Sequence, residues 1–215
     1  MNKNIKEILS EFDLKKFSGN EPSEYHVLKE IEELSTLNNQ TVQDNIASFL
    51  SIYNSNPNLK DNQTLKVLIY ALGVSLFDLT ILRQIKESIN SAMRLFEQTI
   101  LIDGKYFQAY HRLGNCLLYC PQEEYNAISC FKTSIEYEET SIVSVFQTSH
   151  SSTWLGENYL GIGLALARLN RIDDALVFIS ESKSLLGELT IDNGLVGYFN
   201  FSFNNWDEVF DFIKK

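Results

Sequence analysis

The sequence has no long apolar run and few cysteines, prolines or glycines. No stretch approaches the roughly 18 apolar residues that a membrane span needs, and the start, MNKNIKEILSEFDLKKF, lacks the apolar core of a signal peptide. Its three cysteines, an odd number, fit a reducing compartment better than a disulfide framework. These absences predict a cytoplasmic chain with no membrane insertion.

Positive charge is also scarce. The chain has 18 basic and 28 acidic side chains, a net charge of −10, and residues 121–215 hold 14 acidic and 6 basic ones, or −8. Binding of nucleic-acid phosphates needs a basic face, so the sequence predicts no nucleic-acid partner. The acidic charge suits solubility or a partner with basic segments.

With 44% hydrophobic residues and only three prolines and ten glycines, long stretches contain no strong breaker, which favours helices. Apolar residues recur at helical spacing, as in Ile5, Ile8, Leu9 and Phe12. Residues 62–103 contain one glycine and no proline, and we expect a helical pair there with its turn near Asp78 or Thr80. Helices are predicted at 3–16, 23–37, 41–54, 62–77, 80–102, 106–119, 123–138, 153–169, 172–186, 192–203 and 206–214.

From residue 69 onward one pattern of large and small residues repeats. A large residue is followed three later by a Leu-Gly-like pair and then by another large residue; after a turn come a small, a bulky and a small residue. The clearest copy comprises Tyr110, Leu113, Gly114, Leu117, Ala127, Phe131 and Ser134. The next comprises Tyr159, Ile162, Gly163, Leu166, Ala175, Ile179 and Ser182. Weaker copies are Ile69, Leu72, Gly73 and Leu76 with Ala92, Phe96 and Thr99, and Val196, Gly197 and Asn200 with Val209 and Ile213.

This pattern resembles the tetratricopeptide repeat, a helix-turn-helix unit of 34 residues. Positions 92, 127, 175 and 209 are 35, 48 and 34 residues apart. The resemblance implies an all-α, right-handed α-solenoid over 61–215, with units at about 62–103, 106–139, 153–187 and 192–215, after an N-terminal helical extension over 1–60. Its small residues would lie where the two helices of a unit cross, because only small side chains allow that close approach.

Catalytic and metal-binding patterns are missing. The spacing C-x3-C-x9-C of Cys116, Cys120 and Cys130 provides neither the paired thiolates of a zinc site nor a C-x-x-C redox motif. No phosphate loop, G-x-G-x-x-G or G-x-S-x-G motif occurs. We therefore expect inert core cysteines, no cofactor, no metal and no enzyme activity.

The resemblance implies a concave binding face made by the first helix of each unit. That face would comprise Tyr70, Val74, Phe77, Gln108, His111, Asn115, Tyr119, Glu157, Leu160, Leu164, Arg168, Tyr198 and Phe201. Family members that grip a carboxylate do so with Lys, Arg and Asn; Asn115 matches, but the Lys positions hold Tyr70, His111 and Leu160. The sequence thus predicts an adaptor or scaffold whose apolar groove takes a partner peptide or amphipathic helix.

Several alternatives stay open at this point. In one of them, the chain's own N-terminal helices fill the same groove. A secretion-type chaperone for a hydrophobic client and an inhibitory or immunity protein that covers a basic toxin are the other candidate functions, and a homo-oligomer is not excluded. The insertion at 139–153, ETSIVSVFQTSHSST, carries apolar residues that predict either a plug on the chain's own helices or a hook for a partner.

Overall fold

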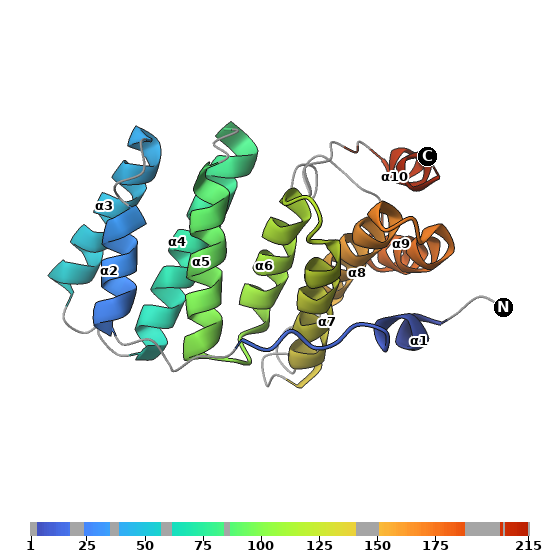
Figure 1. Ribbon diagram of the computed structural model, residues 1–215, viewed down its shortest axis with the longest axis horizontal. Coiled ribbons are helices and arrows are strands. Elements are labelled where there is room, and N and C mark those ends of the chain that lie inside the picture. The colour runs from blue at the N-terminus through green and yellow to red at the C-terminus, as the bar shows by residue number, and fades with distance from the viewer. Residues whose placement is uncertain are drawn as a thin grey trace. The chain divides into compact units, whose positions relative to one another are not determined.

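The computed structural model describes residues 4–17, 24–34, 39–56, 62–83, 87–140, 151–187, 203 and 205–214, and their regular secondary structure is helical throughout. The helices are α1 (Ile5–Leu9), α2 (Glu24–Leu34), α3 (Gln40–Ser55), α4 (Asn62–Arg83), α5 (Glu87–Ile102), α6 (Phe107–Tyr119), α7 (Glu124–Thr140), α8 (Ser151–Arg168), α9 (Ile172–Leu186) and α10 (Trp206–Ile213). Consecutive helices pack in pairs (Figure 1). The prediction of an all-α fold built from such pairs is confirmed.

The chain forms two compact units that interleave in the sequence. One unit comprises Met1–Lys15 and Gly114–Lys215, and the other comprises Lys16–Leu113. The first 15 residues thus fold with the C-terminal half of the chain, more than 100 residues away in sequence.

In the unit of residues 16–113, α4 packs against both α3 and α5. A Cβ atom on Gly73 of α4 would lie 2.8 Å from the ring of Phe96 on α5, so a larger residue would push this ring aside. Ala92, one turn before Phe96, is fully buried. The small residues singled out in the sequence therefore lie where α4 and α5 approach each other closely.

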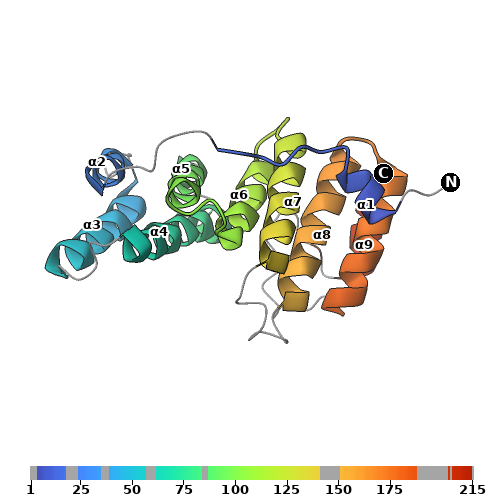
Figure 2. The same ribbon diagram turned by 90° about the horizontal axis from the view of Figure 1, so that it is seen from below.

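In the unit of residues 1–15 and 114–215, α7, α8 and α9 lie side by side (Figure 2). The ring of Phe131 on α7 fits between two glycines: a Cβ on Gly114 would lie 2.8 Å from it and a Cβ on Gly161 of α8 would lie 2.5 Å from it. A Cβ on Gly163 of α8 would likewise lie 2.6 Å from the side chain of Ile179 on α9. Glycines on the first helix of each pair leave room for a large side chain of the second.

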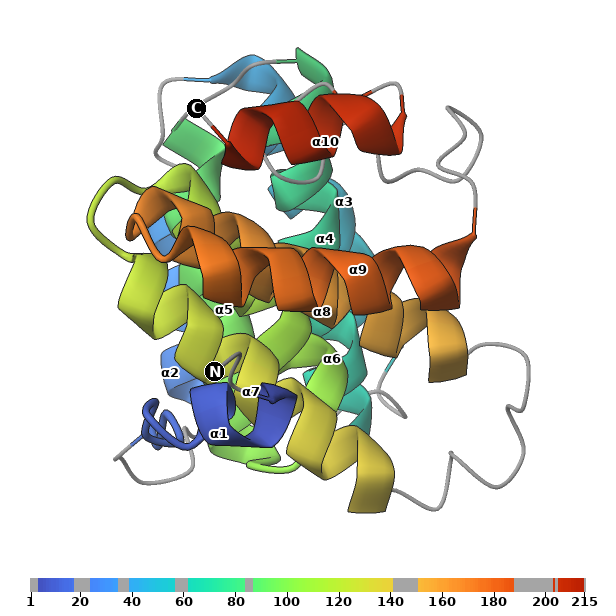
Figure 3. The ribbon, with the colours of Figure 1, turned by 90° about the vertical axis from the view of Figure 1, so that its right-hand side faces the viewer.

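The predicted helix at 3–16 is wrong in its second half. Asn4 and Glu7 form a capping box that starts α1, but the helix ends at Leu9. A turn follows, in which the amides of Glu11 and Phe12 donate to the carbonyls of Ile8 and Leu9, and residues 13–17 have no regular secondary structure. The backbone carbonyls of Glu11, Phe12 and Asp13 accept hydrogen bonds from side chains of α7 instead of from a following turn. Figures 2 and 3 show α1 beside the helices of this unit, in contact with α9.

Two further boundaries differ from prediction. Helix α4 continues through Asp78 and Thr80 to Arg83, so no turn lies near residue 80. The Thr80 hydroxyl donates to the carbonyl of Leu76 and pairs at 2.6 Å with the hydroxyl of Ser88, which satisfies it inside a helix rather than as a cap. Helix α8 begins at Ser151, two residues before the predicted start, and residues 141–150 of the predicted insertion lie outside the described residues. The predicted helix over 192–203 also lies outside them except for Phe203, which is not helical.

Helix α10 closes the described part of the chain. Asn205 caps it by accepting a hydrogen bond from the backbone of Glu208 at 3.0 Å. The indole of Trp206 donates to the carbonyl of Gly187 at 2.6 Å, and the Lys183 ammonium lies 5.8 Å from the ring centre of Phe210. These contacts attach α10 to the end of α9.

Candidate functional site

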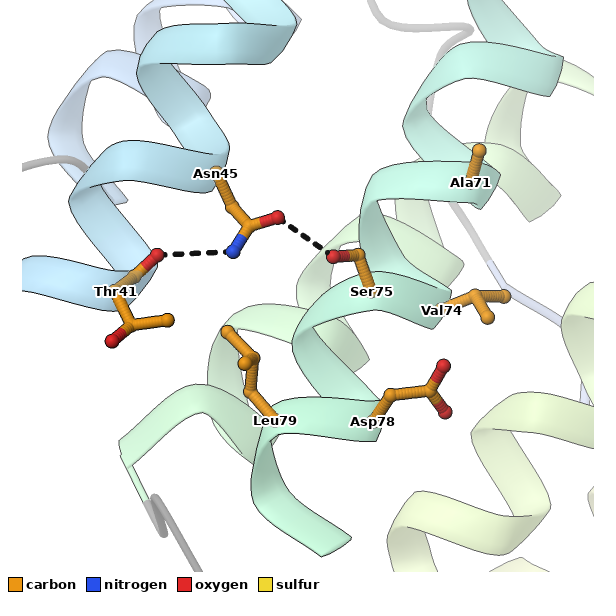
Figure 4. Close-up of a pocket in the computed structure, with 7 residues that line it drawn as sticks. All are labelled: Thr41, Asn45, Ala71, Val74, Ser75, Asp78 and Leu79. Atoms are coloured by element: carbon orange, nitrogen blue, oxygen red, sulfur yellow. Dashed lines mark hydrogen bonds between the residues drawn. The ribbon is translucent and has the colours of Figure 1, made fainter. Parts of the chain in front are cut away.

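A concave feature in the unit of residues 16–113 lies between α3 and α4. It has a volume of about 440 Å³ and is lined by Thr41, Asn45, Ala71, Val74, Ser75, Asp78 and Leu79 (Figure 4). Asn45 of α3 is bonded to Ser75 of α4, and Thr41, one turn before Asn45, lies on the same side as Leu79, one turn after Ser75. The two helices therefore run antiparallel. Ser75 and Leu79 point toward α3, whereas Val74 and Asp78 point to the other side of α4.

The side chain of Asn45 organises the polar end of this pocket. Its amide nitrogen donates to the backbone carbonyl of Thr41 at 3.0 Å, and its amide oxygen accepts from the hydroxyl of Ser75 at 2.9 Å. This pair of bonds fixes which way the amide points and sets the register of α3 on α4. The Ser75 oxygen keeps its acceptor lone pairs for a ligand.

Asp78 supplies the charge at this end of the pocket. Burial raises the pKa of its carboxyl, and the nearby Arg112 guanidinium partly opposes that rise. The protein thus holds a carboxylate where solvation is poor. A cationic or hydrogen-bond-donating group from a ligand would stabilise its charged form.

The opposite end of the same face is apolar. Val67, Ala71 and Val74 follow one side of α4 at spacings of four and three residues, and Val67 is 50% exposed. On α3, Ile52 lies two turns after Asn45 on the same side of that helix and is 54% exposed. We call Val67, Ala71 and Val74 the apolar stripe.

The apolar composition of α4 is explained mainly by its burial against neighbouring helices. By length and composition alone, its residues Gln63–Thr80 could cross a membrane, but 50% of this stretch is buried within the structure. Burial on the sides that face α3 and α5 accounts for that composition. The stripe is the part of the apolar surface that these contacts leave accessible.

The structure places the predicted concave-face residues of α4 in three different environments. Val74 lines the pocket, and Phe77 is fully buried. Tyr70 is half-buried, with its ring 5.8 Å from that of Phe96 and 5.2 Å edge-on from that of Tyr106. Only Val74 of these three therefore belongs to the candidate site.

The predicted concave-face residues of α6 and α8 divide between half-buried and buried positions. Those that keep partial exposure are Gln108, Tyr119, Glu157 and Arg168. Those that are buried are His111, Asn115, Leu160 and Leu164. Arg168 donates to the backbone carbonyl of Leu118, which fixes its guanidinium, while Tyr198 and Phe201 lie outside the described residues. The concave face as a whole stays a prediction.

Four polar lining residues were missed from the sequence: Thr41, Asn45, Ser75 and Asp78. Each has helical spacing to another, Thr41 to Asn45 and Ala71 to Ser75 to Asp78, and this is the pattern of an ordinary solvated helix face. The available signal was that the two faces belong to consecutive helices, which pack against each other. Tertiary contact, not sequence spacing, makes them a site.

The cysteines lie where inert thiols are found. Cys116 and Cys130 are buried and Cys120 is half-buried, and all three are free thiols. Burial, with a smaller effect of Glu123, raises the pKa of Cys120, which disfavours the reactive thiolate. Among the described residues, no three His, Cys, Asp or Glu side chains come together in a way that could hold a metal ion.

The chain matches no protein-family model, no curated protein and no solved structure at a significant level. Its likeness to the tetratricopeptide repeat therefore rests on the sequence pattern alone and stays a prediction.

Proposed function

We propose that the chain is a non-catalytic protein-interaction module that binds an amphipathic helix of a partner protein along α4. The observation that carries this proposal is the apolar stripe, in which exposed Val67 begins one side of α4 that continues through Ala71 and Val74 to Asp78, beside the pocket that Asn45 and Ser75 line. An apolar surface next to fixed polar groups is typical of a helix-in-groove site.

The geometry defines the chemistry of the partner segment. Val67 and Asp78 are eleven positions apart on α4, a distance of about 16 Å along the helix axis. About three turns of a partner helix would cover this length. Leu, Ile or Met side chains at helical spacing would cover the apolar stripe. A Lys or Arg at the far end would reach the Asp78 carboxylate, in agreement with the net charge of −10.

This proposal is tested by recovering partners from native lysate with three baits and quantifying them by mass spectrometry. The baits are the wild-type chain, Ala71→Asp, and Leu169→Asp as a matched control, because Leu169 is 39% exposed and belongs to the other unit. We expect a protein that wild type and the Leu169 variant retain and the Ala71 variant loses. Its bound segment, synthesised as a peptide, should form an amphipathic helix and bind Asp78→Asn several-fold more weakly.

The same experiment separates the alternatives. A partner retained equally by all three baits, or a segment with no apolar face, would contradict the proposed site. A client that is insoluble without this chain would favour the secretion-type chaperone, which would use the same apolar stripe.

An inhibitory role toward a basic protein has one specific observation in its favour. Burial, Glu139 and Glu157 raise the pKa of Glu138 to about 7, so carboxylates of α7 and α8 repel one another. A basic partner would relieve this repulsion. Binding of such a partner should weaken steeply with salt and should be insensitive to Ala71→Asp, which distinguishes it from helix binding on α4.

A further inference from the structure

The exposed side of α4 carries different polar groups at its two ends. Its N-terminal end holds Gln63, its middle holds the apolar stripe, and its C-terminal end holds Ser75 and Asp78. Gln63, Val67 and Ala71 are exposed at spacings of four residues, so they follow one line along the helix. Gln63 and Asp78 are about 22 Å apart along the helix axis, a length that about four turns of a partner helix would cover.

The N-terminal end of this side presents a hydrogen-bond donor. The Lys66 ammonium donates to the side-chain oxygen of Gln63 at 2.6 Å and forms an ion pair with Asp103 at 2.7 Å. Because an ammonium group can only donate, the oxygen of the Gln63 amide faces Lys66 and its NH2 group faces away. Lys66 is 8% exposed and its ammonium lies 4.9 Å from the ring centre of Tyr106, so the group that orients Gln63 is itself held in place.

The C-terminal end presents hydrogen-bond acceptors. The hydroxyl of Ser75 donates to the side-chain oxygen of Asn45 at 2.9 Å, so the lone pairs of the Ser75 oxygen remain to accept a hydrogen bond. The Asp78 carboxylate lines the same pocket. Figure 4 shows Ser75 and Asp78 pointing to either side of α4, so they would flank the end of a helix laid along it.

A helix has a complementary pair of ends. Its first turn has about four backbone N–H groups without an intrahelical partner and a partial positive charge, and its last turn has as many carbonyls and a partial negative charge. A helix that runs antiparallel to α4 brings its N–H groups to Ser75 and Asp78 and its carbonyls to the NH2 group of Gln63. A parallel helix would bring carbonyls to the Asp78 carboxylate, where both groups accept and neither donates.

We propose that the partner segment is an amphipathic helix of about four turns that binds antiparallel to α4, with its N-terminus at Asp78 and its C-terminus at Gln63. This inference rests on the proposed function, which supplies the apolar contact, and adds the direction of the partner helix. The direction sets the order of residues in the partner. The basic residue that reaches Asp78 belongs to the first turn of the partner helix, and the apolar residues that cover the stripe follow it.

A designed peptide tests the direction, because its two ends can be made alike in charge. The probe is an amphipathic peptide of about 16 residues with Leu at helical spacing, a Lys in both its first and its last turn, and blocked termini. Either direction then brings a Lys to Asp78, so only the ends of the helix differ. A photoreactive residue is placed at the first or at the last position, and adducts with the full-length chain are mapped by mass spectrometry. We expect the first position to react near Asp78 and the last position to react near Gln63.

The affinity of the same probe, measured by fluorescence anisotropy, provides a second readout. Gln63→Glu replaces the donor with a carboxylate and should weaken binding about two- to fivefold, whereas Asn90→Asp, the same change at an exposed position of α5, should not. A reversed crosslink pattern, or both positions reacting at both ends, would overturn the antiparallel direction alone, provided that Ala71→Asp still weakens binding. A probe that does not bind, or that binds Ala71→Asp as tightly as wild type, would contradict the proposed function and this inference with it.

Discussion

Two faces of this molecule differ in whether the chain itself already covers them. The α7–α9 face holds residues 4–15, whose Ile8 and Phe12 are buried and whose carbonyls are bonded. The α3–α4 face leaves Val67 and Ile52 about half exposed. In the covered face the contacts are made within the chain, whereas in the open face the chemistry of a partner has to be inferred from the lining.

The two faces also differ in their hydrogen-bond donors. Side-chain donors on α7 bond the backbone carbonyls of residues 11–13, which follow the end of α1. The α3–α4 face has few such donors, since Asn45 and Ser75 are bonded to each other. An amphipathic helix, which satisfies its own backbone, suits that face better.

The largest expected effect tests whether both units are held by the same kind of helix crossing. Gly161→Leu should lower the free energy of unfolding by about 3 kcal/mol, because its side chain would enter the space of the Phe131 ring, already confined by Gly114. Gly73→Leu, against Phe96, should cost a similar or slightly smaller amount. Chemical denaturation measures both.

Gly104→Ala is the control for these two variants, since the nearest atom to its Cβ would be the Ile100 carbonyl oxygen at 3.9 Å. It should change stability by less than about 0.5 kcal/mol. If Gly161→Leu were equally mild, the tight crossing at Phe131 would be refuted.

The next effect compares the covered face with the open one. Phe12→Ala should cost about 2 kcal/mol, because a buried ring is lost from the α7–α9 face, whereas Ile52→Ala on α3 should cost less than about 0.5 kcal/mol. Thermal or urea unfolding of the two variants beside wild type provides the measurement. Equal costs would mean that the two faces do not differ in occupancy.

A smaller effect depends on pH and arises from Glu138, in the unit of residues 1–15 and 114–215. Glu138 is 8% exposed, and its folded-state pKa is raised from 4.5 to about 7 by burial, Glu139 and Glu157. Between these values the folded state keeps a proton that the unfolded state has lost, so stability falls as the pH rises from 4.5 to 7. The loss that this group causes should be on the order of 1–3 kcal/mol.

Glu138→Gln should remove that slope and make the protein more stable than wild type at pH 8, as urea unfolding at pH 5 and pH 8 would show. Glu136→Gln on the same helix is the control and should keep the wild-type slope. An unchanged slope in Glu138→Gln would place the pH dependence elsewhere.

The smallest effect sharpens the description of the open face. Asn45→Ala should cost about 1 kcal/mol, because it removes hydrogen bonds to the Thr41 carbonyl and the Ser75 hydroxyl at a half-buried position. In a double-mutant cycle with Ser75→Ala, the two costs should not add, since both variants remove the same bond. Strict additivity would mean that the bond does not contribute to stability.

Local patterns were sufficient to predict most of the helices. The range predicted at 172–186 coincides with α9, and those at 41–54 and 106–119 differ from α3 and α6 by one residue at one or both ends. Gly114 and Gly163 at helix crossings were also predicted, because each is followed by a large residue, Phe131 after 17 positions and Ile179 after 16. Such features depend on residues less than 30 apart.

Features that depend on distant contacts could not be predicted. Ile5, Ile8 and Phe12 fit a helical face, but their environment comes from α7 and α9, over 100 residues away. Asp78 and Thr80 have the composition of a cap, but no glycine or proline interrupts α4 there, so the helix continues. The polar lining of the α3–α4 pocket becomes visible only when two helices are placed together.

Photo-crosslinking from two positions tests the difference between the faces most directly. A photoreactive residue is placed at Val67 on the open face or at Asn126, exposed on α7 beside Tyr125, and adducts formed in native lysate are mapped by mass spectrometry. We predict that the probe at position 126 reacts within the chain, with residues 4–15, and that the probe at position 67 reacts with an amphipathic segment of another protein. Only intramolecular adducts at position 67, or none to residues 4–15 at position 126, would contradict this account.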